Sequence, residues 1–214
     1  MAKLDKRVLL SALLAPAALA LAADVWRRPL SYYQGYARTR MYISGASSRY
    51  VRVKGIRLHY YAMGPLSGPP ILLLHGLGGR SEDWMPLAPF LTRAGFRVYI
   101  LDLPGCGKSS RPEDFSYSMT DQAHIVIDFM DQLNLRQIDL GGWSMGGWIA
   151  QRMAALRSER FRKLMLFCSA GLYVRPTWNV GLFVPENAQE LAELNQLLMP
   201  DPPQLPDFVV KDVL

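Results

Sequence analysis

The residues best suited to chemistry form the pattern G-x-S-x-G, which Gly142, Ser144 and Gly146 occupy. The pattern lies between a predicted strand and a predicted helix, where a serine on a tight turn projects its hydroxyl out of the sheet. The glycines let the strand and the helix approach closely. The start of the helix supplies free N–H groups and a partial positive charge, which stabilise an oxyanion. We predict that Ser144 is a nucleophile; the alternative is a Gly/Ser turn without chemistry.

A second glycine-rich run, HGLGG at 75–79, follows the apolar residues 70–74. A turn of this kind aims backbone N–H groups at the carboxyl ends of the strands. In acyl transfer, the oxyanion hole takes one N–H from this turn and one from the residue after the nucleophile. We assign these two donors to Leu77 and Met145, with a plain turn as the alternative. The residues that shape the two turns are His75, Gly76, Gly78, Gly142 and Gly146.

Composition narrows the classes of protein. The chain has 214 residues, of which 50% are apolar and 20% are charged, and this balance excludes wholesale disorder. Cys106 and Cys168 are the only cysteines, so they predict two unlinked thiols rather than a disulfide scaffold or a redox pair. No His, Cys or carboxylate cluster has ligand spacing, so we expect no metal and no cofactor. The stretch 102–109 imitates a phosphate-binding loop but starts with Asp102 instead of glycine, which argues against nucleotide binding.

The N-terminal part of the chain is strongly basic. Residues 1–60 hold 11 Lys or Arg against 2 acids, whereas the remainder carries a net charge of −3. Residues 8–23 are apolar apart from Ser11 and Pro16 and follow three basic residues, as in a signal peptide or a signal anchor. A retained anchor, a cleaved signal and a buried core helix all stay open. We expect a membrane partner through residues 8–26 and the basic arm, and no nucleic acid; solvated arginines are the alternative.

Localisation and domain limits follow from these features. We expect a protein that is anchored to a bacterial-type inner membrane or exported, with its orientation open because basic residues flank both ends of the apolar segment. The predicted divisions are a signal anchor or signal peptide at 1–26, a basic linker at 27–48, a core at 49–171 and the start of a cap at 172–214.

Apolar runs alternate with helix-like segments along the rest of the chain. Lys54-Gly55 joins two alternating runs into a hairpin-like pair, and the later continuous runs are typical of strands buried on both faces. The predicted strands are 49–53, 56–63, 70–74, 96–101, 137–140 and 163–168. The predicted helices are 81–94, 120–133, 146–156 and 187–198, and residues 211–214 show no helix pattern. This alternation predicts an α/β fold, a mostly parallel sheet of six strands with helices on both faces.

Taken together, HGLGG (75–79), Trp84, DLPGCGKS (102–109) and GWSMGG (142–147) resemble the α/β-hydrolase superfamily. Within it, the chain is similar to membrane-anchored monoacylglycerol lipases and related bacterial esterases. The resemblance implies a hydrolase with Ser144 as its nucleophile and a helical cap that begins near residue 172. It also implies roughly a hundred further residues and about two more strands, so we expect a C-terminally truncated chain whose open strand edge aggregates.

A serine nucleophile needs a base, and in this fold the order along the chain is Ser, then Asp or Glu, then His. The three histidines all precede Ser144. We expect a structural or solvated His59, a packing role for His75 and no catalytic role for His124. The later loop acids, which stay unassigned, are Asp201, Asp207 and Asp212. The triad acid and histidine are therefore expected to be missing from this chain, with catalysis near background.

The expected activity is serine-dependent hydrolysis of carboxylic esters through an acyl-enzyme on Ser144, with lipid or acyl-glycerol esters as substrates. Epoxide and haloalkane hydrolases require a carboxylate nucleophile in the turn between strand and helix (the nucleophile elbow), where this chain has Ser144. Carbon–carbon bond hydrolases and acyltransferases also use serine and stay open. A different class of function, a catalytically inactive membrane-tethered binding module or a truncated relic, stays open as well.

Overall fold

The computed structural model describes residues 18–172, 175 and 178–214. The described chain divides into two compact units, one within residues 37–173 and the other built from residues before 37 and after 173. Six strands form one sheet: β1 (Ser47–Val53), β2 (Ile56–Met63), β3 (Pro70–Leu74), β4 (Arg97–Leu101), β5 (Ile138–Trp143) and β6 (Phe161–Phe167). The helices are α2 (Pro29–Ile43), α3 (Ala88–Arg93), α4 (Met119–Gln132), α5 (Met145–Leu156), α6 (Ala188–Leu198) and α7 (Asp207–Val213). Short 3₁₀ turns are η1 (Ser81–Trp84), η2 (Ser158–Arg160) and η3 (Val180–Phe183).

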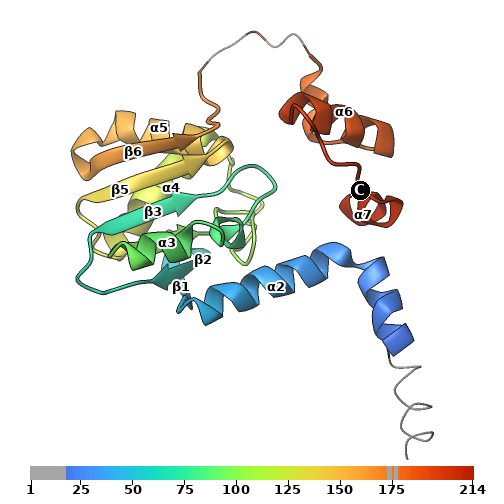
Figure 1. Cartoon of the computed structure of the whole chain (residues 1–214). Helices are drawn as coiled ribbons and strands as arrows, with labels where there is room; N and C mark the ends of the chain where they lie inside the picture. The colour runs from blue at the N-terminus through green and yellow to red at the C-terminus, as the bar shows by residue number, and fades with distance from the viewer. Residues whose placement is uncertain (1–17, 173–174, 176–177) are drawn as a thin grey trace, which may run out of the picture. The chain divides into compact units, whose positions relative to one another are not determined.

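The sheet is mostly parallel, as predicted. Its strand order is β1-β2-β4-β3-β5-β6 (Figure 1). β1 pairs antiparallel with β2, and β2 pairs antiparallel with β4. The remaining pairs are parallel, with Leu74 opposite both Leu101 on β4 and Gly142 on β5. The carboxyl ends of β3, β4 and β5 therefore meet at one edge, where the two glycine-rich turns begin.

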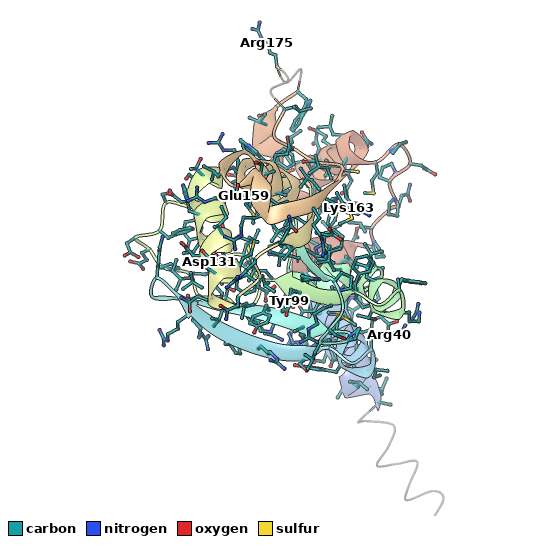
Figure 2. The ribbon with its side chains drawn as sticks, turned by 90° about the vertical axis from the view of Figure 1, so that its left-hand side faces the viewer. Arg40, Tyr99, Asp131, Glu159, Lys163 and Arg175 are labelled. Carbon is teal, nitrogen blue, oxygen red and sulfur yellow. The ribbon has the colours of Figure 1, made fainter. Side chains whose placement is uncertain are left out.

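Two apolar layers cover the faces of this sheet. On one face, Leu58, Leu72 and Leu74 pack with residues of α4 and α5 such as Phe129 and Ile149. On the other face, alternate strand residues pack with the end of α2, with η1 and with the start of α3; they include Tyr61, Ile71, Leu73 and Ile100. Figure 2 shows the side chains on the ribbon, with Tyr99 on β4 and Asp131 on α4 labelled. The alternation along each buried strand follows from its two-residue period.

Three segments differ from the sequence-based expectation. The stretch 27–48, predicted to be a linker, contains helix α2, whose residues Ala37 and Met41 are buried, Met41 in the apolar layer on the sheet. The helix expected over 81–94 is split into η1 and α3, since prolines at 86 and 89 remove backbone donors between them. Residues 207–213 form α7, which includes residues 211–213, where no helix is predicted. Packing on the sheet decides the end of α2, and the two prolines decide the break between η1 and α3.

Strand β6 is one of the two edge strands of the sheet, and β1 is the other. Within the described part of the chain β6 pairs only with β5. Leu164, Leu166 and Phe167 expose 38%, 45% and 39% of their surface, so the edge is apolar, as an open strand edge was expected to be. Unpaired apolar edges favour association with other chains.

The apolar segment predicted at 8–23 lies mostly outside the described residues. Residues 18–27 are helical. Among the residues that the structure describes, no helix is both long enough and apolar enough to cross a membrane.

Candidate active site

Ser144 lies on the turn between β5 and α5 in a strained conformation. Its φ of 52° and ψ of −116° place a residue with a Cβ atom in a region that such residues rarely adopt. Three backbone hydrogen bonds hold the turn: the N–H of Ser144 donates to Phe167 O (2.9 Å), and its carbonyl accepts from Trp148 (3.1 Å) and Ala170 (3.2 Å). The strain is therefore maintained by β6 and α5, and the side chain is left partly exposed.

The flanking glycines are sterically required. A Cβ atom on Gly142 would lie 2.3 Å from the carbonyl oxygen of Gly146. A Cβ atom on Gly146 would lie 2.4 Å from Leu74 O and 2.5 Å from His75 O. The start of α5 thus lies directly against the end of β3, which brings the serine turn and the HGLGG turn together.

The HGLGG turn presents free backbone donors beside Ser144. An ideal Cβ on Gly76 would lie 3.4 Å from Ser144 Cβ, so the two turns are in contact. Gly78 adopts a φ of +68°, which favours glycine and turns the chain back. Within the described residues, the N–H groups of Leu77 and Met145 have no backbone or side-chain acceptor. The geometry therefore offers two unpaired donors next to one serine hydroxyl.

His75 holds the HGLGG turn in place. Its Nδ1–H donates to Gly76 O (2.8 Å), and its Nε2 accepts the N–H of Leu103 (3.1 Å). The side chain is fully buried, and burial lowers the pKa of this imidazole below its ordinary value. A neutral ring with hydrogen on Nδ1 satisfies both bonds. Both ring nitrogens of His75 therefore hold the turn in place, and neither is free to transfer a proton.

Asp102, at the end of β4, is the second anchor of the turn. Its Oδ1 accepts the N–H of Ser81 (2.6 Å), and its Oδ2 accepts the N–H of Lys108 (2.9 Å). Oδ2 also lies 2.7 Å from His59 Nδ1. Burial alone raises the pKa of this carboxyl, but the hydrogen bonds from His59, Lys108 and Ser81 outweigh it and bring the pKa to about 2. Asp102 therefore joins the segment after the HGLGG run, the loop after β4 and strand β2.

None of the three histidines bonds Ser144. His59 is buried and lies between Asp102 and Ser48, whose Oγ is 2.8 Å from His59 Nε2. His75 is bonded as described above, and His124 lies exposed on α4. No described side chain is within hydrogen-bond distance of Ser144 Oγ. The set of the partly buried Ser48 with the buried His59 and Asp102 has no sequence signal, because its members are brought together by long-range strand pairing.

A second buried polar group also has no sequence signal. Glu82 on η1 accepts a hydrogen bond from the Tyr61 hydroxyl (3.0 Å), and the same hydroxyl accepts one from Lys108 Nζ (2.8 Å). Arg38 Nε on α2 lies 3.6 Å from Glu82 Oε1. Burial first, and then Glu82, raise the pKa of Tyr61 far above its ordinary value. This network attaches the end of α2 to the core. Among the described residues, its members make no hydrogen bond with the side chain of Ser48 or Ser144.

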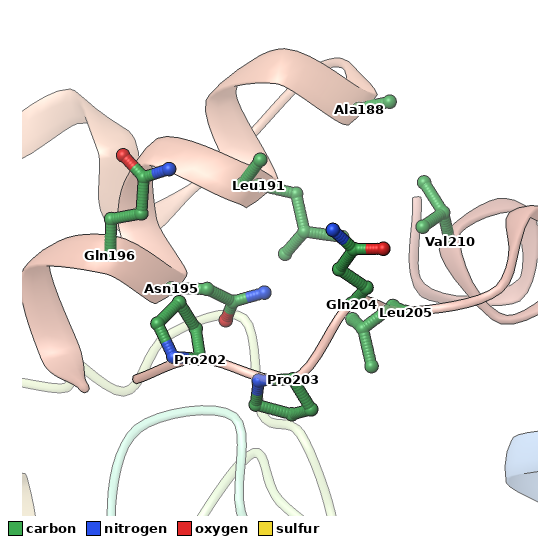
Figure 3. A pocket seen from close by; sticks show the side chains of 10 residues that line it. Ala188, Leu191, Asn195, Gln196, Pro202, Pro203, Gln204, Leu205 and Val210 are labelled. Atoms are coloured by element: carbon green, nitrogen blue, oxygen red, sulfur yellow. The ribbon is translucent and has the colours of Figure 1, made fainter. Parts of the chain in front are cut away.

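The unit formed by the chain ends has a hollow whose described lining includes no candidate catalytic group. Its hollow, with a volume of about 430 Å³, is lined by Leu191, Asn195, Gln204, Leu205 and further apolar or amide side chains (Figure 3). None of these residues is an acid, a base or a nucleophile. Of the unassigned acids, Asp212 accepts the N–H of Leu30 (2.8 Å), so it has a structural partner at the start of α2.

Comparison with known proteins defines the family. A family model described as alpha/beta hydrolase fold matches residues 69–214. The match covers more than half of the chain, so the chain belongs to the α/β-hydrolase family. The parallel strands β3 to β6 and the turn that carries Ser144 fall within the matched part, whereas β1 and β2 precede it.

Individual relatives have several activities. Bifunctional epoxide hydrolase 2 of Sus scrofa is 32% identical over 164 residues, which cover 76% of this chain and 24% of that protein. The 2-hydroxy-6-oxononadienedioate/2-hydroxy-6-oxononatrienedioate hydrolase of Escherichia coli (strain K12 / DH10B) is 32% identical over 159 residues, 71% of this chain and 53% of that protein. The crystal structure of a membrane phospholipase A, a bacterial virulence factor, has a TM-score of 0.71 at 31% identity, covering 98% of this chain and 69% of that chain. This chain thus spans only part of each protein that it resembles.

Proposed function

We propose that the chain carries the nucleophile and the oxyanion hole of a serine-dependent hydrolase of carboxylic esters. The observation that carries this proposal is the strained Ser144 beside the unpaired N–H groups of Leu77 and Met145. Strain at a serine, at the start of a helix and facing free donors, is typical of a nucleophile rather than of a structural turn.

The chemistry follows from these positions. Ser144 Oγ attacks the ester carbonyl carbon and transfers its proton to a base, while the carbonyl electron pair moves to oxygen. The N–H groups of Leu77 and Met145 stabilise this oxyanion. Collapse of the intermediate expels the alcohol, and water then releases the acid from the acyl-enzyme. Because the three histidines are bonded elsewhere or exposed, the proposal assigns the base and its carboxylate to residues beyond these 214.

For the substrate, we propose lipid or acyl-glycerol esters. The similarity to a membrane phospholipase A supports a lipid substrate, although the phospholipase activity is a property of that protein. Serine in the elbow favours carbonyl substrates over the epoxides of another relative. A basic N-terminal arm fits anionic lipid surfaces.

We propose that the protein associates with a membrane through residues 8–26 and the basic arm. In the described part of this region, Trp26, Tyr33 and Tyr36 expose 62%, 58% and 53% of their surface. Aromatic rings and arginines together are typical of the membrane–water interface. The protein is then either anchored to the membrane or exported.

Fluorophosphonate labelling of the native protein tests this function. Membrane and soluble fractions of the source cells are labelled, and the modified peptide is identified by mass. We expect a membrane band labelled at Ser144, a loss of labelling of about a thousandfold or more in Ser144→Ala, and normal labelling in Ser48→Ala. An unlabelled band that contains the same peptides would favour the non-catalytic binding module. Product analysis then separates the remaining alternatives. Release of the free acid from an acyl-glycerol indicates an ester hydrolase, whereas acyl transfer or carbon–carbon cleavage indicates one of the other two classes.

A further inference from the structure

One face of the β1–β2 hairpin carries two arginines without an acidic partner. Arg52 on β1 is paired directly with Arg57 on β2, next to the two-residue turn Lys54-Gly55. Both side chains are exposed, and neither makes an ion pair or a side-chain hydrogen bond with a described residue. Like charges directly opposite each other destabilise an antiparallel pair. A bound anion would therefore remove a cost that the protein alone leaves uncompensated.

Ring contacts join these arginines to the end of α2 in one strip. The Arg57 guanidinium lies over the Tyr50 ring, 4.7 Å from its centroid, and the Tyr50 ring lies 5.1 Å from the ring of His59. The ring of Tyr61 lies 4.9 Å from that of His59 and 6.0 Å from that of Tyr42 on α2. His59 and Tyr61 are buried, whereas Tyr42 and Tyr50 expose 48% and 49% of their surface. We call the exposed residues of this strip and its end the hairpin face; they are Tyr42, Ile43, Tyr50, Arg52 and Arg57.

The hairpin face is positively charged. Its residues belong to one compact unit, and the sequence from Val25 to Ser81 contains no acid. The carboxylates beneath the strip, Glu82 and Asp102, are buried and already accept hydrogen bonds from this chain. Asp114 of the nearby loop lines a hollow with Ile56, on the α4 side of the sheet. The charge of the hairpin face therefore fits an anionic partner outside the described chain.

We propose that the hairpin face docks on the surface of a bilayer that contains anionic phospholipids. The planar guanidinium groups of Arg52 and Arg57 bind lipid phosphates. The rings of Tyr42 and Tyr50 lie at the level of the headgroups, where amphipathic aromatic side chains are enriched. Ile43, which exposes 78% of its surface, enters the boundary of the acyl chains. The inference shares its partner with the proposed membrane association but assigns the contact to the folded core, independently of residues 8–26.

The hairpin face lies towards the edge of the sheet that carries Ser144. The N–H of Asp102, directly after β4, donates to the carbonyl oxygen of His59 (2.9 Å). The N–H of Ser110, further along the same loop, donates to the carbonyl oxygen of Arg57 (2.9 Å). The start of β2 therefore extends past the carboxyl end of β4, at the edge where the serine turn begins. Docking thus brings this edge close to lipid esters, a role that rests on the proposed function.

Footprinting of the full-length protein on vesicles tests the docking. The protein is bound to vesicles of phosphatidylcholine or of phosphatidylglycerol. Arginines are modified with phenylglyoxal, tyrosines are oxidised with hydroxyl radicals, and each rate is read from its peptide. On phosphatidylglycerol we expect the hairpin face to react about fivefold more slowly than on phosphatidylcholine. The N-terminal segment is present in both samples, so the difference reports the contact with anionic lipid.

Matched variants assign the protection to the two arginines. Arg52→Gln combined with Arg57→Gln is expected to abolish the protection of Tyr42 and Tyr50, since each arginine strengthens binding about fivefold. Arg136→Gln combined with Arg152→Gln removes the same charge from exposed positions before β5 and on α5, and should keep the protection. Equal rates on both lipids in the wild type, or protection that survives the first double substitution, overturns the proposal.

Two further measurements identify the partner and separate this inference from the proposed function. Soluble glycerophosphate at the phosphate concentration of the vesicles should leave the hairpin face reactive; equal protection by it overturns the lipid surface as the partner. Fluorophosphonate labelling is measured in the same samples. Labelled Ser144 with an unprotected hairpin face refutes the docking and leaves the proposed function standing. A protected hairpin face in protein that is never labelled supports the docking and refutes the proposed nucleophile.

Discussion

Two serines on the same sheet show two opposite environments. Ser144 has a strained backbone, a partly exposed side chain and no bonded base, and it lies beside unpaired N–H donors. Ser48 lies in regular strand β1, and its hydroxyl is 2.8 Å from His59, which is 2.7 Å from Asp102. The second set has the distances of a catalytic relay, but His59 and Asp102 are completely buried. Relay distances alone therefore do not identify a nucleophile, because a substrate must also reach it and find donors for its oxyanion.

The two environments also depend on different physical terms. The turn at Ser144 depends on the absence of side chains at Gly142 and Gly146, where a methyl group would overlap backbone oxygens. The Ser48–His59–Asp102 set depends on a buried carboxylate that accepts hydrogen bonds from several donors. Adding a methyl group should break the first environment, and removing a charge should break the second.

The largest effect on stability is expected from Asp102→Asn. An amide leaves the donors of His59, Ser81 and Lys108 poorly satisfied, so we expect a loss of about 3 kcal/mol at pH 7. Because the folded pKa of Asp102, about 2, lies below its ordinary value of 3.8, the charge stabilises the fold above pH 4, and this part is lost as the pH falls towards 2. This charge-dependent part of the free energy of unfolding amounts to about 2 kcal/mol.

Urea unfolding of the wild type and Asp102→Asn at pH 7, 4 and 3 checks this expectation. The difference between the two proteins should be greatest at pH 7 and should narrow at pH 3. A constant difference across this range would show that the charge of Asp102 does not stabilise the fold.

A smaller effect is expected from Gly146→Ala. The new methyl group meets the carbonyl oxygens of Leu74 and His75 at 2.4 and 2.5 Å, and relief of this overlap should cost about 2 kcal/mol. The same change at Gly35 of α2, where the added Cβ atom would meet no heavy atom within 4 Å, should stabilise by about 0.5 kcal/mol instead. Thermal unfolding of both variants measures the contrast, and labelling of Ser144 should slow only in Gly146→Ala. Similar melting temperatures would mean that the turn tolerates a side chain.

The smallest effect is expected from Ser48→Ala. It removes one hydrogen bond to the buried His59 and should cost about 1 kcal/mol in urea unfolding. Ser47→Ala, an exposed neighbour on β1, is the matched control and should change stability very little. If Ser48→Ala reduced the labelling of Ser144, the two serine environments would not be independent.

Much of the core could be predicted from local patterns. The strands β2 and β3 have the predicted bounds, and the other strands differ by a few residues at their ends. The G-x-S-x-G turn lies where strand and helix patterns meet, since both glycines and the change of period are local signals. In contrast, α2 was not predicted, because only two of its residues, Ala37 and Met41, are buried and the sequence shows no apolar face.

The sequence by itself determined the order of strands and helices, the family and the position of the serine turn, because residue spacing and turn residues act over a few neighbours. Only the tertiary structure decided which polar groups are paired. His59 and Asp102 are 43 residues apart, and their bond arises where β2 pairs with β4. The strip of rings from Tyr42 on α2 to Tyr50 on β1 likewise exists only once α2 lies on the sheet, since contacts between distant segments leave no local pattern in the chain.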